Sequence, residues 1–566
     1  MKIHTYDAVV IGTGAAGYNA AIRLTEAGVN TAIVTEGVNC GTSRNTGSDK
    51  QTYYKLGLSG DSPDSVRKMA RDLFNGGCVD GDNALCEAAL SARCFLNLCE
   101  LGVPFPQNRY GEYVGYKTDH DPYERATSAG PLTSKFMTEA LERKASSLNI
   151  KIFDGYRAVK ILKKDNRACG LLAIKDGETV AFRARDIVMA TGGPAGIYEN
   201  SVYPTSHVGA SGLAIDAGAK MQNLAVWQYG LASVNPRWNV SGTYMQVLPR
   251  FVSVDKDGCE HDFLWEHFCD KYDGLSLVFL KGYEWPYFEK NRSSTIDMLV
   301  YDECKKGRHV YLDFTKNPFD IDFTKLSGEA YDYLKKADAL FGTPIERLAK
   351  MNAPAIELYK EKGVDLYTEY LEIALCAQHN NGGVAVNSWW QSSVKGLYAV
   401  GECAGTHGLA RPGGSALNAG QVGSLRAAQY ISAHPSPLLA ENEFLSIAER
   451  VKITLCDESD KITEAKKRMS LYGGAVRDRE KINKTLEITL KELENARSPA
   501  LYDTLLTQGA VLFAMKCENA DPALVQEVVY DGKEFTVSTR PVRAIPDDDS
   551  FFENVWREYR NNKNIY

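Results

Sequence analysis

The chain has 566 residues, a length that suits two or three domains. Its residues are 44% hydrophobic and 24% charged, as in ordinary globular proteins, and the formal net charge is −7. This charge and the absence of a basic run argue against a nucleic-acid partner. No apolar run approaches transmembrane length and no signal peptide opens the chain, so we expect no membrane insertion and a cytoplasmic location. The 13 cysteines include no CxxC pair and give no indication of zinc or an iron–sulfur cluster.

The first predicted unit is a strand, a helix and a second strand at the N-terminus. Residues 8–11 form a short apolar run typical of a buried strand, and Gly12, Gly14 and Gly17 follow in GxGxxG spacing. The segment YNAAIRLTEAG predicts a helix that ends on Gly28, and TAIVTE predicts a strand that ends at Glu36. Such a turn lets a pyrophosphate approach the helix N-terminus, while the acid binds a ribose hydroxyl pair. The unit therefore predicts a dinucleotide site.

Two later segments indicate that this dinucleotide is FAD rather than NAD. Residues 184–196 predict a strand that runs into Ala190, Thr191 and Gly192, and residues 394–405 predict another that ends at Glu402. Both are typical of late strands that return to a flavin cofactor after long insertions. The sequence has no second GxGxxG, so we expect no separate NAD(P)H domain.

Three long segments share their motifs with a known family: TGGPAGIYENSVYPTSHVGASGLAIDAGAKMQNLAVWQY (191–229), GLYAVGECAGTHGLARPGGSALNAGQVGSLRAAQYI (396–431) and RMSLYGGAVRDREKINKTLEITLKEL (468–493). On these segments the chain resembles the flavoprotein subunits of the fumarate reductase/succinate dehydrogenase family, over nearly its full length. It implies an α/β fold: a Rossmann-like FAD-binding domain with an inserted α+β capping domain and a C-terminal helical domain. The implied boundaries are 1–232 and 375–434 for the FAD-binding domain, 233–374 for the capping domain and 435–566 for the helical domain.

Some members of that family attach the flavin covalently through a histidine after the second strand. Here the corresponding segment, GVNCGTSRNTGSDKQTYYK, has no histidine, so we predict non-covalent FAD. The predicted cofactor-binding residues are Gly12, Gly14, Ala15, Ala16, Gly17, Glu36, Thr42, Ser43, Asn45, Thr46, Gly47, Val159, Ala190, Thr191, Gly192, Ser211, Glu402, Ser415, Ala416 and Leu417.

The resemblance also implies where the chemistry takes place. Arg411, in HGLARPGG, falls at the family's substrate-binding arginine, and an arginine fork suits a carboxylate. Arg292 falls near the capping-domain arginine that the family uses as proton donor, with Asp297 or Glu289 as a relay partner. Thr243 falls at the family's substrate threonine.

Departures from the family pattern suggest a different substrate. Gly230 and Gln378 replace two histidines of the dicarboxylate enzymes, and Tyr244 replaces an acid. His379, one residue further on, either replaces a lost histidine or is a buried structural histidine. We expect glycine at 230 to open space beside aromatic residues, which favours a flat or apolar group at the far end of a carboxylate substrate. An aryl or heteroaryl acrylate fits this description.

The sequence thus predicts an FAD-dependent reductase or dehydrogenase, of enoate reductase type, that acts on a C–C or C=C bond beside a carboxylate or acyl group. Three alternatives stay open: an oxidase resembling aspartate oxidase, the flavoprotein subunit of an electron-transfer complex, and a non-catalytic FAD-binding protein. The expected partners are a small anionic substrate and an electron donor or redox protein that the sequence does not identify.

Overall fold

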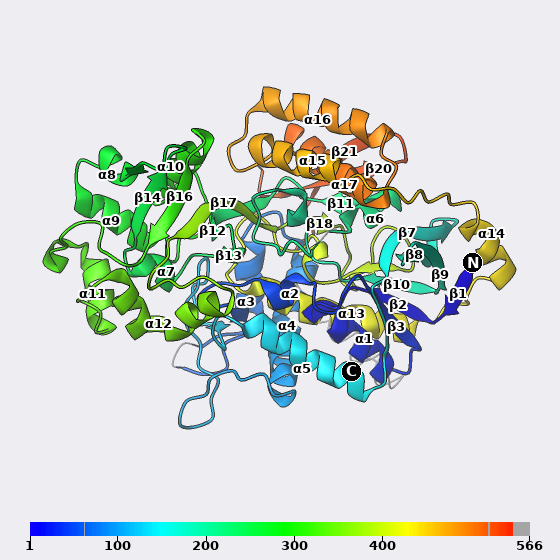
Figure 1. Cartoon of the computed structure of the whole chain (residues 1–566). Helices are drawn as coiled ribbons and strands as arrows, with labels where there is room; N and C mark the ends of the chain where they lie inside the picture. Colours follow the sequence, from blue (N-terminus) through cyan, green and yellow to red (C-terminus); the bar gives the residue numbers. More distant parts are fainter. Residues whose placement is uncertain (61–62, 208, 519–520, 547–566) are drawn as a thin grey trace.

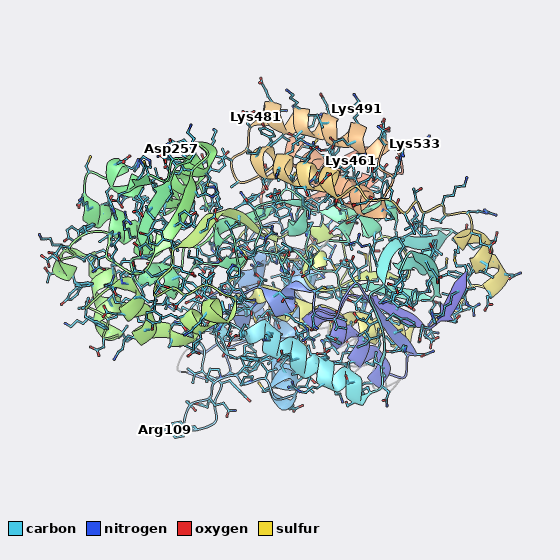
Figure 2. All side chains as sticks on the ribbon, viewed as in Figure 1. Arg109, Asp257, Lys461, Lys481, Lys491 and Lys533 are labelled. Carbon is cyan, nitrogen blue, oxygen red and sulfur yellow. The ribbon has the colours of Figure 1, made fainter. Side chains whose placement is uncertain are left out.

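The computed structural model describes residues 1–60, 63–207, 209–518 and 521–546. Figure 1 shows three parts: a region built around the N-terminal strands, a region of residues near 240–370 beside it, and the helices α15, α16 and α17 above. Residues 547–566 of the predicted C-terminal domain lie outside the described residues. Charged side chains such as Asp257, Lys481 and Lys491 point away from the body of the molecule (Figure 2).

A five-stranded parallel sheet in the order β19-β10-β2-β3-β6 forms the centre of the N-terminal region. Its strands are mostly apolar, and β2, β3 and β10 are buried along their length, as expected of a parallel sheet with both faces covered. Their bounds are β2 (Ala8–Ile11), β3 (Thr31–Thr35), β6 (Lys151–Asp154), β10 (Asp186–Met189) and β19 (Leu397–Ala399). Helices α1 (Ala15–Glu26) and α13 (Ser415–Ala433) pack against each other beside this sheet, which brings distant segments of the chain together.

The predicted strand–helix–strand unit is present. Helix α1 begins three residues earlier than YNAAIRLTEAG, directly after Gly14, so the turn and the helix start coincide. A four-stranded sheet in the order β1-β9-β8-β7 packs near it. Its bounds are β1 (Lys2–Thr5), β7 (Arg157–Lys164), β8 (Arg167–Lys175) and β9 (Glu178–Arg183).

A six-stranded sheet in the order β13-β12-β17-β16-β14-β15 forms the capping region. Its bounds are β12 (Trp227–Ser233), β13 (Trp238–Asn239), β14 (Arg250–Val254), β15 (Glu260–His261), β16 (His309–Asp313) and β17 (Leu371–Asn380). A separate apolar core, which includes Trp238, Tyr244 and Phe251, lies within this region. Strands β12 and β17 cross the predicted boundaries at 232 and 374, so the two regions share a continuous sheet.

Helices surround both regions. Those of the capping region are α7 (Thr243–Gln246), α8 (Phe263–His267), α9 (Lys271–Leu280), α10 (Ser294–Lys305), α11 (Gly328–Lys336) and α12 (Pro344–Glu361), with the 3-10 turn η2 (Phe323–Lys325). The remaining elements before residue 435 are α2 (Thr42–Asn45), β4 (Tyr53–Tyr54), α3 (Val66–Phe74), α4 (Gly81–Glu100), β5 (Ala126–Thr127), α5 (Thr133–Ser147), η1 (Ala195–Ile197), α6 (Ser211–Asp216), β11 (Met221–Gln222), β18 (Gly383–Val384) and η3 (Gly401–Cys403).

The C-terminal region contains the expected helices and two strands besides. Its helices are α14 (Glu441–Ala448), α15 (Ser459–Tyr472), α16 (Arg479–Glu494) and α17 (Pro499–Lys516). Strands β20 (Leu524–Tyr530) and β21 (Phe535–Pro541) follow, and β20 pairs with β11 in the sheet β18-β11-β20-β21. The last strands therefore tie the end of the described chain to a segment in its first half. Within the described ranges, no helix is long and apolar enough to cross a membrane.

Candidate functional site

One cavity of about 1850 Å³ runs between the N-terminal sheet and the capping region. The glycine turn after β2, the loop before α13 and a capping loop, residues 282–288, all line it. Residues predicted to bind a cofactor and residues predicted to bind a substrate therefore meet in one continuous space.

The glycine turn has the close backbone contacts that its sequence predicts. Gly12 has φ +108°, and a Cβ there would lie 2.5 Å from the carbonyl oxygen of Ala190. A Cβ on Gly17 would lie 2.1 Å from the oxygen of Gly12, so α1 packs against the turn only with glycine at that position. The start of α1 is thus left open toward the cavity, as an anionic pyrophosphate requires.

Sixteen of the 20 predicted cofactor-binding residues line the cavity: Gly12, Gly14, Ala15, Ala16, Glu36, Thr42, Ser43, Thr46, Gly47, Val159, Ala190, Thr191, Gly192, Glu402, Ala416 and Leu417. Four do not. Gly17 packs under the turn, Asn45 donates to the carbonyls of Asn39 and Gly41, and Ser211 and Ser415 are buried first residues of α6 and α13. These four support the cavity wall rather than face the cavity.

Several lining residues were missed from the sequence. Arg157 pairs with Glu36 at the predicted ribose end, and Tyr502 and Asp503 of α17 also line the cavity. Desolvation raises the pKa of Asp503 to about 7. No motif marks these residues, because only the tertiary fold carries α17 to this position.

A histidine from a distant segment lies near the predicted flavin contacts. His207 Nδ1 is 3.2 Å from Thr42 Oγ1, and its Nε2 is 3.2 Å from the carbonyl oxygen of Gly193. The carbonyl can only accept, so Nε2 carries the proton and Nδ1 accepts from Thr42. Both ring nitrogens are therefore in use, although the segment after β3 itself has no histidine.

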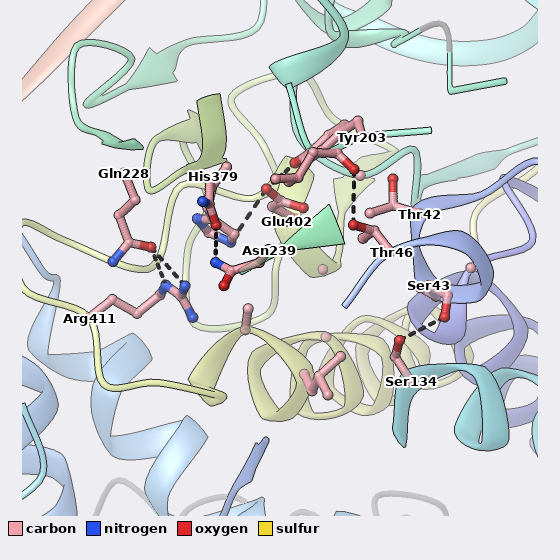
Figure 3. A pocket seen from close by; sticks show the side chains of 18 of the residues that line it. Thr42, Ser43, Thr46, Ser134, Tyr203, Gln228, Asn239, His379, Glu402 and Arg411 are labelled. Atoms are coloured by element: carbon pink, nitrogen blue, oxygen red, sulfur yellow. Dashed lines mark hydrogen bonds and ion pairs between the residues drawn. The ribbon is translucent and has the colours of Figure 1, made fainter. Parts of the chain in front are cut away.

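Arg411 lies on the cavity wall and is buried, with 7% of its surface exposed. Its Nη2 and Nε donate to Oε1 of Gln228, at 2.7 and 3.3 Å (Figure 3). Burial lowers the pKa of its guanidinium, while Asp119 and Glu402 act in the opposite direction. The other lysines and arginines that line the described cavity are exposed or only partly buried, so Arg411 is the one buried member of this group.

His379 and Glu402 lie next to each other on the same side of the site as Tyr203 (Figure 3). His379 Nε2 is 3.5 Å from Glu402 Oε1, which also accepts from the hydroxyl of Tyr203. Burial, Arg411 and His407 hold the pKa of His379 well below its usual range. Burial raises the pKa of Glu402 to about 7, despite Tyr203 and Arg411.

The space expected at Gly230 is filled. A Cβ there would lie 2.8 Å from the carbonyl oxygen of Trp285 and 2.9 Å from Nε2 of Gln378. Gly230 forms a bridge with Pro286, and the amide of Tyr287 donates to Tyr229 O at 2.7 Å. Glycine therefore admits the capping loop instead of opening a pocket, a correction to the sequence-based expectation.

The capping loop is held firmly at its base. Lys281 Nζ, which is buried, donates to the carbonyls of Glu284 and Trp285 at 2.6 and 3.1 Å and pairs with Asp297 at 2.8 Å. The loop places four aromatic residues along the cavity: Tyr283, Trp285, Tyr287 and Phe288. Of the aromatic residues in β12 and β13, Trp227 lines the cavity, whereas Tyr229 and Trp238 are buried and do not line it.

The sequence places five residues at the substrate site as candidates for catalysis: Arg292, Arg411, Thr243, His379 and Tyr244. Arg411 and His379 line the cavity, whereas the other three do not. The Arg292 side chain is 74% exposed and pairs with Asp273 on the surface, so its placement does not support the proton-donor role. Thr243 donates to Asp49 Oδ2 through its amide and hydroxyl, at 2.8 and 2.9 Å, behind the cavity wall. Tyr244 is fully buried in the capping core and donates to Ala355 O.

The residues present fit FAD. A Cβ has no room at Gly12, the start of α1 accommodates phosphate, and Glu36 stands where a ribose would lie. The same cavity includes the glycine turn and Arg411. When bound, FAD would supply hydride chemistry beside Arg411.

The chain matches a known family and curated relatives over most of its length. The family described as FAD binding domain matches residues 7–417. The A subunit of fumarate reductase (CoM/CoB) from Methanothermobacter marburgensis is 26% identical over 492 residues, covering 84% of this chain and 80% of the relative. L-aspartate oxidase of Bacillus subtilis is 24% identical over 441 residues, covering 75% and 72%.

Solved structures extend the likeness to the fold. A quinol-fumarate reductase chain, solved with menaquinol molecules, superposes with a TM-score of 0.73 at 18% identity, covering 96% of this chain and 99% of that one. The Sdh1 complex of Mycobacterium smegmatis gives a TM-score of 0.72 at 20% identity, covering 98% of both chains. Identity at this level supports the fold alone, and the family match supports the cofactor. The chain therefore belongs to the FAD-binding family that includes the fumarate reductase and succinate dehydrogenase flavoproteins, and it is an FAD-dependent oxidoreductase.

Proposed function

We propose that the protein transfers hydride between FAD and a C=C or C–C bond next to a carboxylate, and that its substrate carries a flat aromatic group instead of a second carboxylate. The observation that carries this proposal is Arg411: a buried guanidinium on the wall of a cavity whose capping side is aromatic. An aryl acrylate, such as cinnamate, has both features.

Arg411 is suited to hold the carboxylate. Its hydrogen bonds go to the amide oxygen of Gln228, which is a weaker acceptor than a carboxylate. A charge-assisted hydrogen bond contributes about 1.5–3 kcal/mol, and more of this is realised where water is excluded. The guanidinium also stabilises negative charge that develops on the acid as the double bond is reduced.

The capping loop argues against a dicarboxylate. A second carboxylate at the far end would meet the rings of the loop and the amides of Gln228, Asn239 and Gln378, without a second buried lysine or arginine among the described lining residues. Leaving an ionised group without a partner is costly, whereas an aromatic group gains contact with aromatic side chains. The geometry therefore favours a monocarboxylate.

The proposal is tested by an anaerobic screen of unsaturated acids with reduced viologen as electron donor. Cinnamate should be reduced at least about tenfold faster, in kcat/KM, than fumarate, which corresponds to about 1.4 kcal/mol of discrimination. Equal rates on the two acids would overturn the proposed substrate class.

Two further points belong to this proposal. FAD is bound non-covalently, because both ring nitrogens of His207 are engaged in hydrogen bonds, with Thr42 and with the carbonyl of Gly193. Flavin that stays with the chain on a denaturing gel would contradict this.

Electrons come from a separate donor or redox protein, in keeping with the relative that is named as one subunit of a fumarate reductase. A redox protein that co-purifies and reduces the flavin would identify that donor.

The relative named L-aspartate oxidase favours a second candidate, an oxidase that passes electrons to oxygen. The two candidates differ in a simple measurement. An oxidase produces stoichiometric hydrogen peroxide with its amino-acid substrate in air, whereas the proposed reductase gives flavin reoxidation by an unsaturated acid without oxygen.

A further inference from the structure

The orientation of the His379 ring is fixed by Asn381. The Asn381 amide Nδ2 donates to Gly408 O at 2.7 Å, so its Oδ1 faces His379 Nδ1, at 2.8 Å. The reverse orientation of the amide would set two acceptors against each other. Because Oδ1 only accepts, His379 Nδ1 carries the hydrogen and Nε2 carries the lone pair.

Nε2 of His379 has an unusual neighbour. Among the described residues it has no hydrogen-bond partner, and Glu402 Oε1 lies 3.5 Å away. A lone pair and an ionised carboxylate repel each other in a buried site. A proton on Glu402 removes this conflict, since the carboxyl then donates toward Nε2 while accepting from Tyr203.

Burial and two neighbouring side chains keep the proton off the imidazole of His379. Arg411 and His407 disfavour a positive imidazolium on His379. The ring centroids of His407 and His379 lie 4.9 Å apart. Tyr203, which donates to Glu402, and Arg411 both lower the pKa of Glu402, but burial has the larger effect. Burial raises the pKa of Glu402 to about 7, so a neutral carboxyl is present near neutral pH.

We propose that Glu402 and His379 together hold one proton on the cavity wall beside Arg411 and deliver it to the substrate carbon through His379, with Asn381 as the positioning residue. The inference rests on the proposed function. Reduction of the double bond needs one hydride, which reduced FAD supplies when bound, and one proton. The proton passes from the Glu402 carboxyl to Nε2 of His379 and from the same Nε2 to the substrate carbon, while Nδ1 keeps its hydrogen on Asn381. The remaining carboxylate is reprotonated from solvent.

The position of Arg292 leaves the reaction without its expected proton donor. With that arginine exposed outside the cavity, another group must protonate the product. Asp49 also lines the cavity and burial raises its pKa, but its Oδ2 accepts from both the amide and the hydroxyl of Thr243, which oppose that rise. Tyr116 lines the cavity and its hydroxyl lies 2.7 Å from Thr52 Oγ1, which makes it the matched control.

The first test is independent of turnover. Infrared difference spectra of the FAD-loaded protein across pH 5 to 9 should show a protonated carboxyl band that disappears as pH rises through about 7. Burial also raises the pKa of Asp503 to about 7 and that of Glu87 to about 8, so the signal of Glu402 is the part of this band that Glu402→Gln removes. Absence of the band from the wild-type protein, or a band of unchanged intensity in E402Q, would overturn the proposal whether or not cinnamate is a substrate.

The second test uses activity on the best acid found by the screen. Glu402→Gln and His379→Phe should each lower kcat by about 10²- to 10⁴-fold, the usual range for loss of a general acid. Asn381→Ala should lower kcat by about tenfold and displace the pH profile, with little change in KM. Tyr116→Phe should stay within about threefold of the wild-type kcat, since it keeps the ring and leaves the proposed proton path intact. A large loss in the Tyr116 variant with normal kcat in E402Q would contradict the proposal.

Discussion

The two walls of the cavity differ in how they are built. The cofactor wall uses backbone geometry: glycines of the turn after β2 and the start of α1 leave room for the dinucleotide. The substrate wall uses side chains on a loop that is attached to β12 and pinned by Lys281. The glycine turn of the first wall is encoded by one short stretch of chain, whereas the second wall depends on contacts between segments far apart in the sequence. The predictions below test this difference, starting with the largest effect.

Arg411→Met should have the largest effect on catalysis. Removal of the buried cation takes away both the carboxylate partner and charge stabilisation, so kcat/KM should fall by at least about 10³-fold. FAD content should be unchanged. Arg411→Lys should recover only part of the activity, because an ammonium lacks the planar fork. Normal kcat/KM in the methionine variant would show that the anchor lies elsewhere.

Gly12→Val should abolish cofactor binding. The new side chain would meet the carbonyl of Ala190 in a backbone conformation, φ +108°, that valine avoids. The flavin-to-protein absorbance ratio of the purified variant should fall more than about tenfold. Gly28→Ala is the matched control, since Gly28 also has positive φ, +80°, but nothing lies within 4 Å of its Cβ. It should cost about 1 kcal/mol of stability and retain FAD.

Gly230→Ala should alter substrate selection while leaving the cofactor in place. Its methyl group would displace the capping loop at Trp285 or the amide of Gln378, and such overpacking costs about 1–3 kcal/mol. We expect KM for the aryl acid to rise about tenfold with normal FAD content. Gly328→Ala, where the added Cβ meets nothing within 4 Å, should leave KM unchanged. An unaltered KM in Gly230→Ala would remove the loop from the substrate wall.

Asp503→Asn should change the pH dependence of stability. Desolvation raises the pKa of Asp503 to about 7, so the folded state favours its neutral form. The stability contributed by the neutral carboxyl is therefore fully present below about pH 4, near the pKa of the unfolded chain. It is lost as pH rises through about 7, because the buried site disfavours the ionised carboxylate. The variant should have a higher Tm than the wild-type protein at pH 8 and a similar Tm at pH 4. A lower Tm at pH 8 would contradict the sign of this linkage.

Arg292→Ala should have the smallest effect. The side chain is exposed and its pair with Asp273 lies on the surface, where an ion pair contributes about 0–1 kcal/mol. Both kcat/KM and FAD content should stay within about twofold of the wild-type values. A loss of kcat of about a hundredfold would restore the proton-donor role that the sequence predicted for this arginine.

Much of the cofactor wall could be predicted from the sequence to lie together, because its glycine turn acts through local geometry. Gly12 and Gly14 are needed wherever a backbone turns against a phosphate, and Glu36 follows at a fixed spacing. Arg411 is found because it lies in a glycine-rich loop that closely matches the family. Asn45, Ser211 and Ser415 lie at helix ends beside the cavity, yet they do not line it, which spacing alone does not determine.

The substrate wall was harder to predict for a physical reason. A glycine at position 230 can either leave a pocket empty or let another segment of backbone pack against it. The bridge between Gly230 and Pro286 shows that the second case applies here. Arg292 and Lys281 are both cations near one loop, but Lys281 is buried with Asp297 while Arg292 faces solvent. Which of two nearby cations turns inward depends on the packing of α9 and α10, not on the sequence pattern.

The central claim is that Arg411 binds the carboxylate of an aryl acid in a cavity closed by aromatic residues. Anaerobic stopped-flow reoxidation of the reduced, FAD-loaded protein by cinnamate and by fumarate tests it most directly. The account predicts saturable reoxidation by cinnamate, lost in Arg411→Met, and slow reoxidation by fumarate. Rapid reoxidation by fumarate, or reoxidation by cinnamate that persists in Arg411→Met, would contradict it.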